Sequence, residues 1–172
     1  MPKNGDAWWH LILTARNTWI PGDERGFRNR HHRIHSTGDY KNPPPPEEHA
    51  GLRNYCKSIA GEEILFPKPL RKPMGNAMLA TLQKANLRCI AIAVAKTHCH
   101  ILVECEDDRD VAKRLTSRLK QTASFAVRNQ QPGRLWANGC KAIRARDQNH
   151  QRHIFRYILN HSQKEGAWVW QY

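Results

Sequence analysis

A His-x-His pair, His98 and His100, lies inside an apolar run at residues 97–104. The run follows the apolar segment 89–95 and a short Lys-Thr break, a pattern typical of the second strand of a β-hairpin. Residues two apart on a strand point to the same face and lie about 7 Å apart along its axis. The sequence therefore predicts two imidazoles side by side on a rigid support, where both can bind one metal ion.

The same alternation divides the rest of this strand between two faces. It places Glu104 with the histidines and gives the opposite face an apolar row suited to a core, made of Cys99, Ile101, Val103 and Cys105. Alone, a His-x-His pair is a weak indication of a metal site, because short motifs recur by chance. Two neighbouring histidines can equally face solvent or border a core, so the pair needs partners from elsewhere in the chain.

Tyr157 and His161 are candidates for those partners. They are four residues apart in a segment, 148–163, that we predict to be the last helix, and they share one helical face with His150 and His153. A phenol has a pKa of about 10 and is a poor nucleophile unless a nearby cation or base assists it. The alternative interpretation of Tyr157 is a structural residue at the edge of the core.

Length and charge narrow the class of protein. The 172 residues favour one domain with a substantial core. The chain has 28 Lys and Arg against 15 Asp and Glu, and its net charge of +13 favours a polyanionic partner, nucleic acid before a membrane surface. No run approaches the roughly 20 apolar residues of a membrane-spanning helix, and residues 7–13 are too few for a signal sequence. We expect a cytoplasmic protein without a membrane partner.

The cysteines and the distribution of charge add further limits. The five cysteines are odd in number and show no Cys-x-x-Cys spacing, which indicates neither a disulfide framework nor a structural zinc ribbon. Residues 108–156 contain twelve Lys and Arg but three Asp and Glu, a local net charge of +9. This concentration is suited to tracking phosphates, although a solvated basic face has the same composition. The candidate nucleic-acid-binding residues are Lys113, Arg114, Arg118, Lys120, Arg144 and Arg156.

The remaining elements follow from hydrophobic spacing and helix-end signals. Before the hairpin we predict a strand at 8–14, a helix at 47–58, a strand at 63–66 and a helix at 74–85. After the hairpin we predict a helix ending near 128, a strand-like segment at 140–145, and the last helix between an Asp147 N-cap and Gly166. His10, inside the first strand, receives no role. The segment from about 16 to 46 is predicted to be a flexible basic loop, whose cationic side chains suit a phosphate backbone or plain solvation: Arg25, Arg28, Arg30, His31, His32, Arg33 and His35.

Two of these motifs resemble those of a known family, the HUH-class single-tyrosine transposases, in particular the REP-associated tyrosine transposases. The sequence His-Cys-His-Ile-Leu-Val at 98–103 is similar to their metal-binding strand, and Tyr-Ile-Leu-Asn-His at 157–161 is similar to their tyrosine helix. Leu135-Trp136 also matches a pair that commonly precedes that helix. The resemblance extends from Trp8 to about Gly166, and the two motifs together are far more specific than either alone.

The resemblance implies a single α+β domain with a ferredoxin-like (RRM-like) antiparallel sheet and helices packed on one face. It implies a DNA transposition enzyme that cuts single-stranded or hairpin DNA through a 5′-phosphotyrosine at Tyr157 and frees a 3′-OH. His98, His100 and His161 would hold Mg²⁺ or Mn²⁺, and both a homodimer and a monomer are compatible with the family. His161-Ser162 replaces the Asn-Pro or Gln of many relatives, which leaves the third ligand open and makes zinc an alternative metal.

Two other functions are compatible with the same residues. A non-catalytic relative would keep the fold and the basic surface and bind DNA or RNA as a regulator. A metal-dependent nuclease would use water as its nucleophile, with Tyr157 only structural. The intact set of His98, His100 and Tyr157 argues against the non-catalytic relative.

Overall fold

A computed structural model describes residues 2–3, 5–27, 35–38, 42–45 and 47–172. The chain divides into two compact units, one formed by residues 1–16 and 64–172 and the other by residues 17–63, which we call the sheet unit and the insert unit. The insert unit contains helix α1 (Ala50–Ala60), close to the predicted helix at 47–58. The prediction of one domain with a basic loop at about 16–46 stays a prediction, and its residues Arg28, Arg30, His31, His32 and Arg33 lie outside the described residues.

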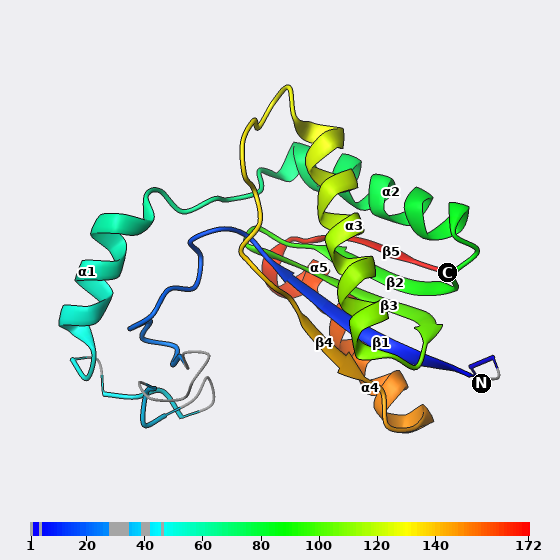
Figure 1. The fold of residues 1–172 in the computed structure, drawn as a ribbon, viewed down its shortest axis with the longest axis horizontal. Helices are drawn as coiled ribbons and strands as arrows, with labels where there is room; N and C mark the ends of the chain where they lie inside the picture. Colours follow the sequence, from blue (N-terminus) through cyan, green and yellow to red (C-terminus); the bar gives the residue numbers. More distant parts are fainter. Residues whose placement is uncertain (1, 4, 28–34, 39–41, 46) are drawn as a thin grey trace. The chain divides into compact units, whose positions relative to one another are not determined.

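The sheet unit is built on a five-stranded antiparallel sheet with the order β4-β1-β3-β2-β5 (Figure 1). Helix α2 (Lys68–Lys84) connects β1 to β2, and α3 (Arg109–Val127) connects β3 to β4. These connections and the central order β4-β1-β3-β2 are those of a ferredoxin-like α+β domain, so the predicted fold class is confirmed. The strands are β1 (Asp6–Thr14), β2 (Cys89–Val94), β3 (His98–Glu106), β4 (Lys141–Arg144) and β5 (Trp168–Gln171).

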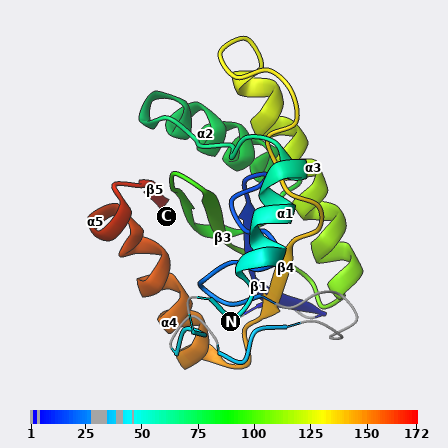
Figure 2. The same cartoon turned by 90° about the vertical axis from the view of Figure 1, so that its left-hand side faces the viewer.

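The central strand β3 presents different side chains to the two faces of the sheet, as the alternation predicted. Cys99, Ile101 and Val103 belong to the main core, beneath α2 and α3, and we call this side the cysteine face. Leu102 lies on the other side, which we call the histidine face, and packs in a smaller core with residues of α4 (Gln148–Leu159). Figure 2 shows α2 and α3 on one side of the sheet and α4 on the other. Helices therefore cover both faces, not one face as expected, because Ile154 and Ile158 of α4 pack on the second face, and the site lies on that side.

Two predictions of local structure are wrong near α2. No strand forms at 63–66. Two isolated backbone hydrogen bonds hold this segment instead, from the Ile64 amide to the Arg16 carbonyl and from the Phe66 amide to the Lys96 carbonyl. Helix α2 begins at Lys68, six residues before the predicted start at Met74, and it includes two prolines. A proline in the first turn loses no helical hydrogen bond, and Pro73 loses one, which the burial of the helix's apolar face offsets.

The C-terminal segment also differs from its prediction. The predicted helix at 148–163 is two helices, because α4 ends at Leu159 and α5 (His161–Glu165) follows Asn160. The predicted ends are confirmed: the Asp147 carboxylate accepts a hydrogen bond from the His150 amide at 2.8 Å, and Gly166 takes the left-handed conformation after α5. Strand β5, which we did not predict, follows at once. Among the described residues, no helix combines the length and apolar character needed to cross a membrane.

Candidate metal and tyrosine site

His98 and His100 stand on the most protected strand of the sheet. Strand β3 begins at His98, directly after the β2–β3 turn, and has β1 on one side and β2 on the other. His100 is 3% exposed. The strand therefore fixes the backbone of both histidines through hydrogen bonds on two sides, as a metal site requires.

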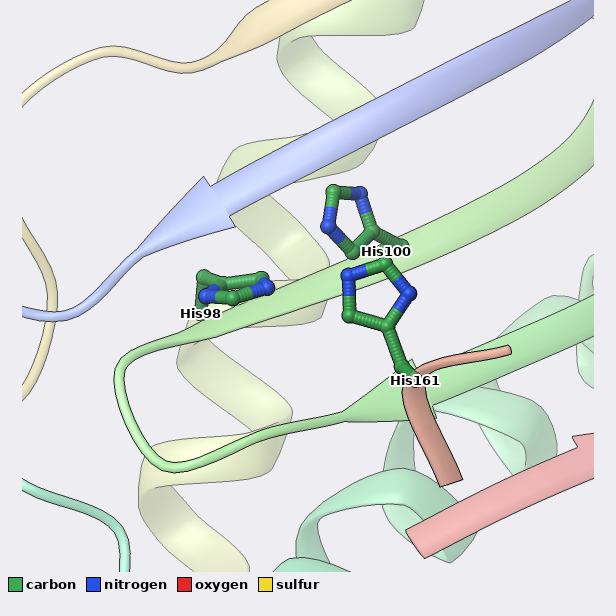
Figure 3. Close-up of side chains that lie close together, drawn as sticks. All are labelled: His98, His100 and His161. Atoms are coloured by element: carbon green, nitrogen blue, oxygen red, sulfur yellow. The ribbon is translucent and has the colours of Figure 1, made fainter. Parts of the chain in front are cut away.

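His161 reaches the same place from α5. It is 5% exposed, and its Nδ1 lies 2.9 Å from the carbonyl oxygen of Tyr157, to which it can donate a hydrogen bond. That bond leaves Nε2 with the lone pair that a metal ion needs. One ligand nitrogen from each of His98, His100 and His161 lies within 4.8 Å of the other two (Figure 3). Nitrogens bound to one ion are about 3 to 3.5 Å apart, so small rotations of the rings close the site.

A fourth histidine, His10 of β1, supports the group. It is 5% exposed, and its Nε2 lies 2.9 Å from Nδ1 of His100. A proton on His100 Nδ1, donated to His10, leaves the lone pair of His100 on Nε2, which is buried and has no hydrogen-bond partner among the described residues. A buried nitrogen without a partner is costly, and an ion bound there would satisfy it. The donor set of this structure therefore fits a metal ion.

Burial keeps the imidazoles of His10 and His100 neutral. It lowers the pKa of His10 to about 4, with smaller contributions from the charges of His161, Lys141 and His150. Burial also holds the pKa of His100 far below its ordinary value, helped by the neighbouring histidines. Only a neutral imidazole binds a metal ion, so at pH 7 these groups need to release no proton before the ion enters.

Tyr157 borders the histidines from α4. Its ring centroid lies 4.7 Å from that of His161, 5.2 Å from that of His100 and 6.0 Å from that of His10, each with the rings nearly perpendicular. The side chain remains 46% exposed. A substrate in solution can therefore reach the tyrosine while the histidines beneath it stay protected.

The six predicted nucleic-acid-binding residues do not form one surface. Arg156 lies exposed on α4, the helix that carries Tyr157. The four on α3 lie on the other side of the sheet, and one of them, Lys120, donates hydrogen bonds to the carbonyls of Ala137 and Gly139. The side chain of Arg144 makes two hydrogen bonds of 2.6 Å to the Asp107 carboxylate. DNA binding by these residues stays a prediction. It is least supported for Lys113, Arg114 and Arg118, because α3 lies on the side of the sheet opposite Tyr157.

The sequence reasoning missed two residues near the site. His10 received no role because its contact with His100 depends on the pairing of β1 with β3, which places His10 opposite Leu102. The alternation of the first strand shows only that His10 shares a face with Trp8, so the local pattern alone could not have placed it beside His100. The second is Glu165, which lies two residues beyond the end of the predicted helix at 148–163 and was therefore given no role.

The fold and the histidine group together define a class: a ferredoxin-like α+β domain with a three-histidine candidate metal site and a tyrosine beside it. No model of a protein family matches the chain, and no protein of curated function matches it. A solved structure with a similar fold is that of a REP-associated tyrosine transposase bound to a REP hairpin, with a TM-score of 0.50 and 14% sequence identity. The match covers 92% of this chain and 67% of that one. At this identity the similarity shows the shared fold.

Proposed function

We propose that this protein is a metal-dependent single-strand DNA endonuclease and strand-transfer enzyme that acts in DNA transposition through a 5′-phosphotyrosine. The observation that carries the proposal is the position of Tyr157, whose ring lies against His161 and His100 at the open side of the histidine group. The structurally similar transposase is bound to a REP hairpin, which makes a DNA hairpin the first substrate to test.

In this proposal, His98, His100 and His161 would hold the ion, which when bound would supply Lewis-acid polarisation of the scissile phosphate. The phenol oxygen of Tyr157 attacks phosphorus, and the bond from phosphorus to the 3′ oxygen breaks. The phenol proton passes to water, which reaches the half-exposed side chain, and the departing 3′ oxygen takes a proton from water. One phosphodiester replaces another, so the 3′-OH of a second strand can reverse the step and join the DNA.

The proposed ligands bear on the choice of metal. Mg²⁺ and Mn²⁺ both serve in phosphate chemistry, but Mg²⁺ prefers oxygen ligands and dehydrates reluctantly. Three imidazoles suit Mn²⁺ or zinc better. Of the two ions that the family resemblance implies, we therefore favour Mn²⁺.

The DNA partner follows from charge and from the place of the tyrosine. The net charge of +13 favours a polyanion, and Arg156 is one residue before Tyr157 on the exposed side of α4. A phosphate at the tyrosine would have Arg156 within reach of the adjoining backbone. Each phosphate contact releases counterions, so binding should weaken steeply with salt.

The test is a denaturing gel of the protein with Mn²⁺ and hairpin oligonucleotides that carry single-stranded tails. A 5′-phosphotyrosine retains the fragment on the 3′ side of the cut, so a 3′ label should migrate with the protein and a 5′ label should appear on a free fragment. Two free fragments without an adduct would indicate the water-using nuclease. Tight binding with no cut on any hairpin would indicate the non-catalytic regulator.

A further inference from the structure

The carboxylate of Glu165 lies between two histidines of the candidate metal site. Its Oε2 is 3.7 Å from Nε2 of His98, and its Oε1 is 4.0 Å from Nε2 of His161. The side chain is 40% exposed, so it is neither buried by packing nor extended freely into solvent. The two nitrogens that it faces come from different elements, β3 and α5.

Hydrogen bonds hold the backbone around Glu165. Glu165 is the last residue of α5, and the Ala167 amide donates a hydrogen bond to the His161 carbonyl at 3.2 Å, which closes the helix. Arg71, 5% exposed, donates hydrogen bonds from Nη1 to the Gly166 carbonyl and from Nε to the Phe66 carbonyl. The short helix that supplies His161 therefore also positions the backbone of Glu165.

Glu104 is the other carboxylate to consider on this face of β3. It is 2% exposed, and its two oxygens accept hydrogen bonds from the Arg88 side chain and the Lys3 amide. It is also four residues beyond His100, about 13 Å along the strand. Glu104 is thus engaged elsewhere, whereas Glu165 faces the histidines.

We propose that Glu165 is a fourth protein ligand of the metal ion, so that the site consists of three imidazoles and one carboxylate oxygen. This inference rests on the metal site of the proposed function. Cis ligands of an octahedral ion are about 3 Å apart. The separations of the Glu165 oxygens from the His98 and His161 nitrogens, 3.7 and 4.0 Å, exceed that distance slightly, so rotation of the glutamate side chain can bring an oxygen to the ion. The carboxylate halves the positive charge that the neutral histidines leave on a divalent ion.

A fourth ligand of this kind also selects among metals. Carboxylate oxygens suit Mn²⁺, and an octahedral ion with four protein ligands keeps two positions for water and phosphate oxygen. Zinc in structural sites is satisfied by four ligands, and Glu165 would then occupy the position that a substrate needs. The proposed set therefore favours Mn²⁺ as the working ion and zinc as an inhibitor.

The experiment measures metal binding without DNA, by calorimetric titration of the whole protein with Mn²⁺. Glu165→Gln keeps the size of the side chain and should weaken Mn²⁺ binding by at least about tenfold. Glu106→Gln is the matched control, because Glu106 is an exposed carboxylate on the same strand as His98 but about 26 Å along it. The Mn²⁺ affinity of this variant should equal that of the wild type. Unfolding curves in EDTA should be the same for both variants and the wild type.

The visible absorption of bound Co²⁺ shows whether Glu165 binds the ion directly or only lies near it as a charge. The visible bands of bound Co²⁺ depend on the ligands, so Glu165→Ala should change their position and intensity. Wild-type affinity in Glu165→Gln, or unchanged bands in Glu165→Ala, would overturn the assignment of Glu165 and leave the three-histidine site in place. Failure of the wild type to bind Mn²⁺, Co²⁺ or zinc would overturn the metal site itself and the role of Glu165 with it.

Discussion

The two faces of strand β3 are built from adjacent residues and have opposite chemistry. On the cysteine face, Cys99, Ile101 and Val103 are completely buried beneath α2 and α3. On the histidine face, the ring of His100 lies against Tyr157 of α4, and the ring of His98 lies against His161 of α5. A shift of the strand by one residue would exchange the two sets, so the main core also fixes the direction of the site.

The ionisable groups on the two faces respond to burial in ways that suit their places. Burial raises the pKa of Cys99 far above its ordinary value and that of Cys89 to about 12, so both thiols stay protonated and behave as small apolar side chains. Burial lowers the pKa values of His10 and His100, which prepares both rings for hydrogen bonding and metal binding. The same loss of water makes one face inert and the other ready to bind a cation.

Tyr157→Phe should abolish the proposed chemistry of the histidine face and leave the cysteine face unchanged. The change removes only the phenol oxygen, so cleavage and the covalent adduct should fall by at least about a thousandfold while DNA binding survives. A denaturing gel for the adduct and a binding titration measure the two effects.

Two other tyrosines provide controls for that experiment. Tyr55 is 64% exposed in the insert unit and Tyr172 is 96% exposed at the C-terminus, so Tyr55→Phe and Tyr172→Phe should keep full activity. Tyr40, the remaining tyrosine, lies outside the described residues. Cleavage retained by Tyr157→Phe would transfer the role of nucleophile to water.

His100→Ala and Cys99→Ala compare the faces at neighbouring positions. His100→Ala removes a proposed ligand, so Mn²⁺ should no longer raise the melting temperature and cleavage should be lost. Cys99→Ala removes a completely buried sulfur that lies 3.7 Å from the sulfur of Met78, so it should lower stability by about 1 kcal/mol and leave Mn²⁺ affinity unchanged. Thermal melts with and without Mn²⁺ measure both. A metal response lost in Cys99→Ala but kept in His100→Ala would contradict the assignment of the faces.

The alternation of β3 could be predicted because it is a local pattern of one strand. The same holds for Tyr157 and His161, whose four-residue spacing survives the end of α4 because both residues still point to one side. His10 and Glu165 reach the site through strand pairing and a helix break, and neither feature can be deduced from local spacing. The start of α2 was mistaken because its prolines indicate a loop, whereas packing of the apolar side of the helix outweighs that preference.

Acid pH should weaken the metal-free protein through the histidine face. The pKa of His10 is lowered to about 4 in the folded protein, from 6.5 for a free imidazole, so the unfolded chain takes up the proton first as the pH falls. The contribution of neutral His10 to the free energy of unfolding is complete above pH 6.5 and is lost as the pH falls toward 4. The loss from this residue is about 3 kcal/mol. Urea unfolding in EDTA between pH 7 and pH 4 measures it. His10→Asn should reduce the slope, and an unchanged slope would mean that other groups dominate.

The smallest expected effect concerns which side of the sheet carries the DNA. Arg156 is beside Tyr157 on α4, whereas Arg118 is exposed on α3, on the other side. DNA that reaches the tyrosine must pass α4 and needs to bend around the sheet to meet α3. Arg156→Ala should therefore weaken binding several-fold, by about 1 kcal/mol, and reduce the slope of log affinity against log salt by about one, as expected for one lost phosphate contact. Arg118→Ala changes the charge equally and should have a smaller effect. Binding titrations over a range of salt compare the two variants, and a larger loss for Arg118→Ala would place the DNA along α3, on the side of the cysteine face.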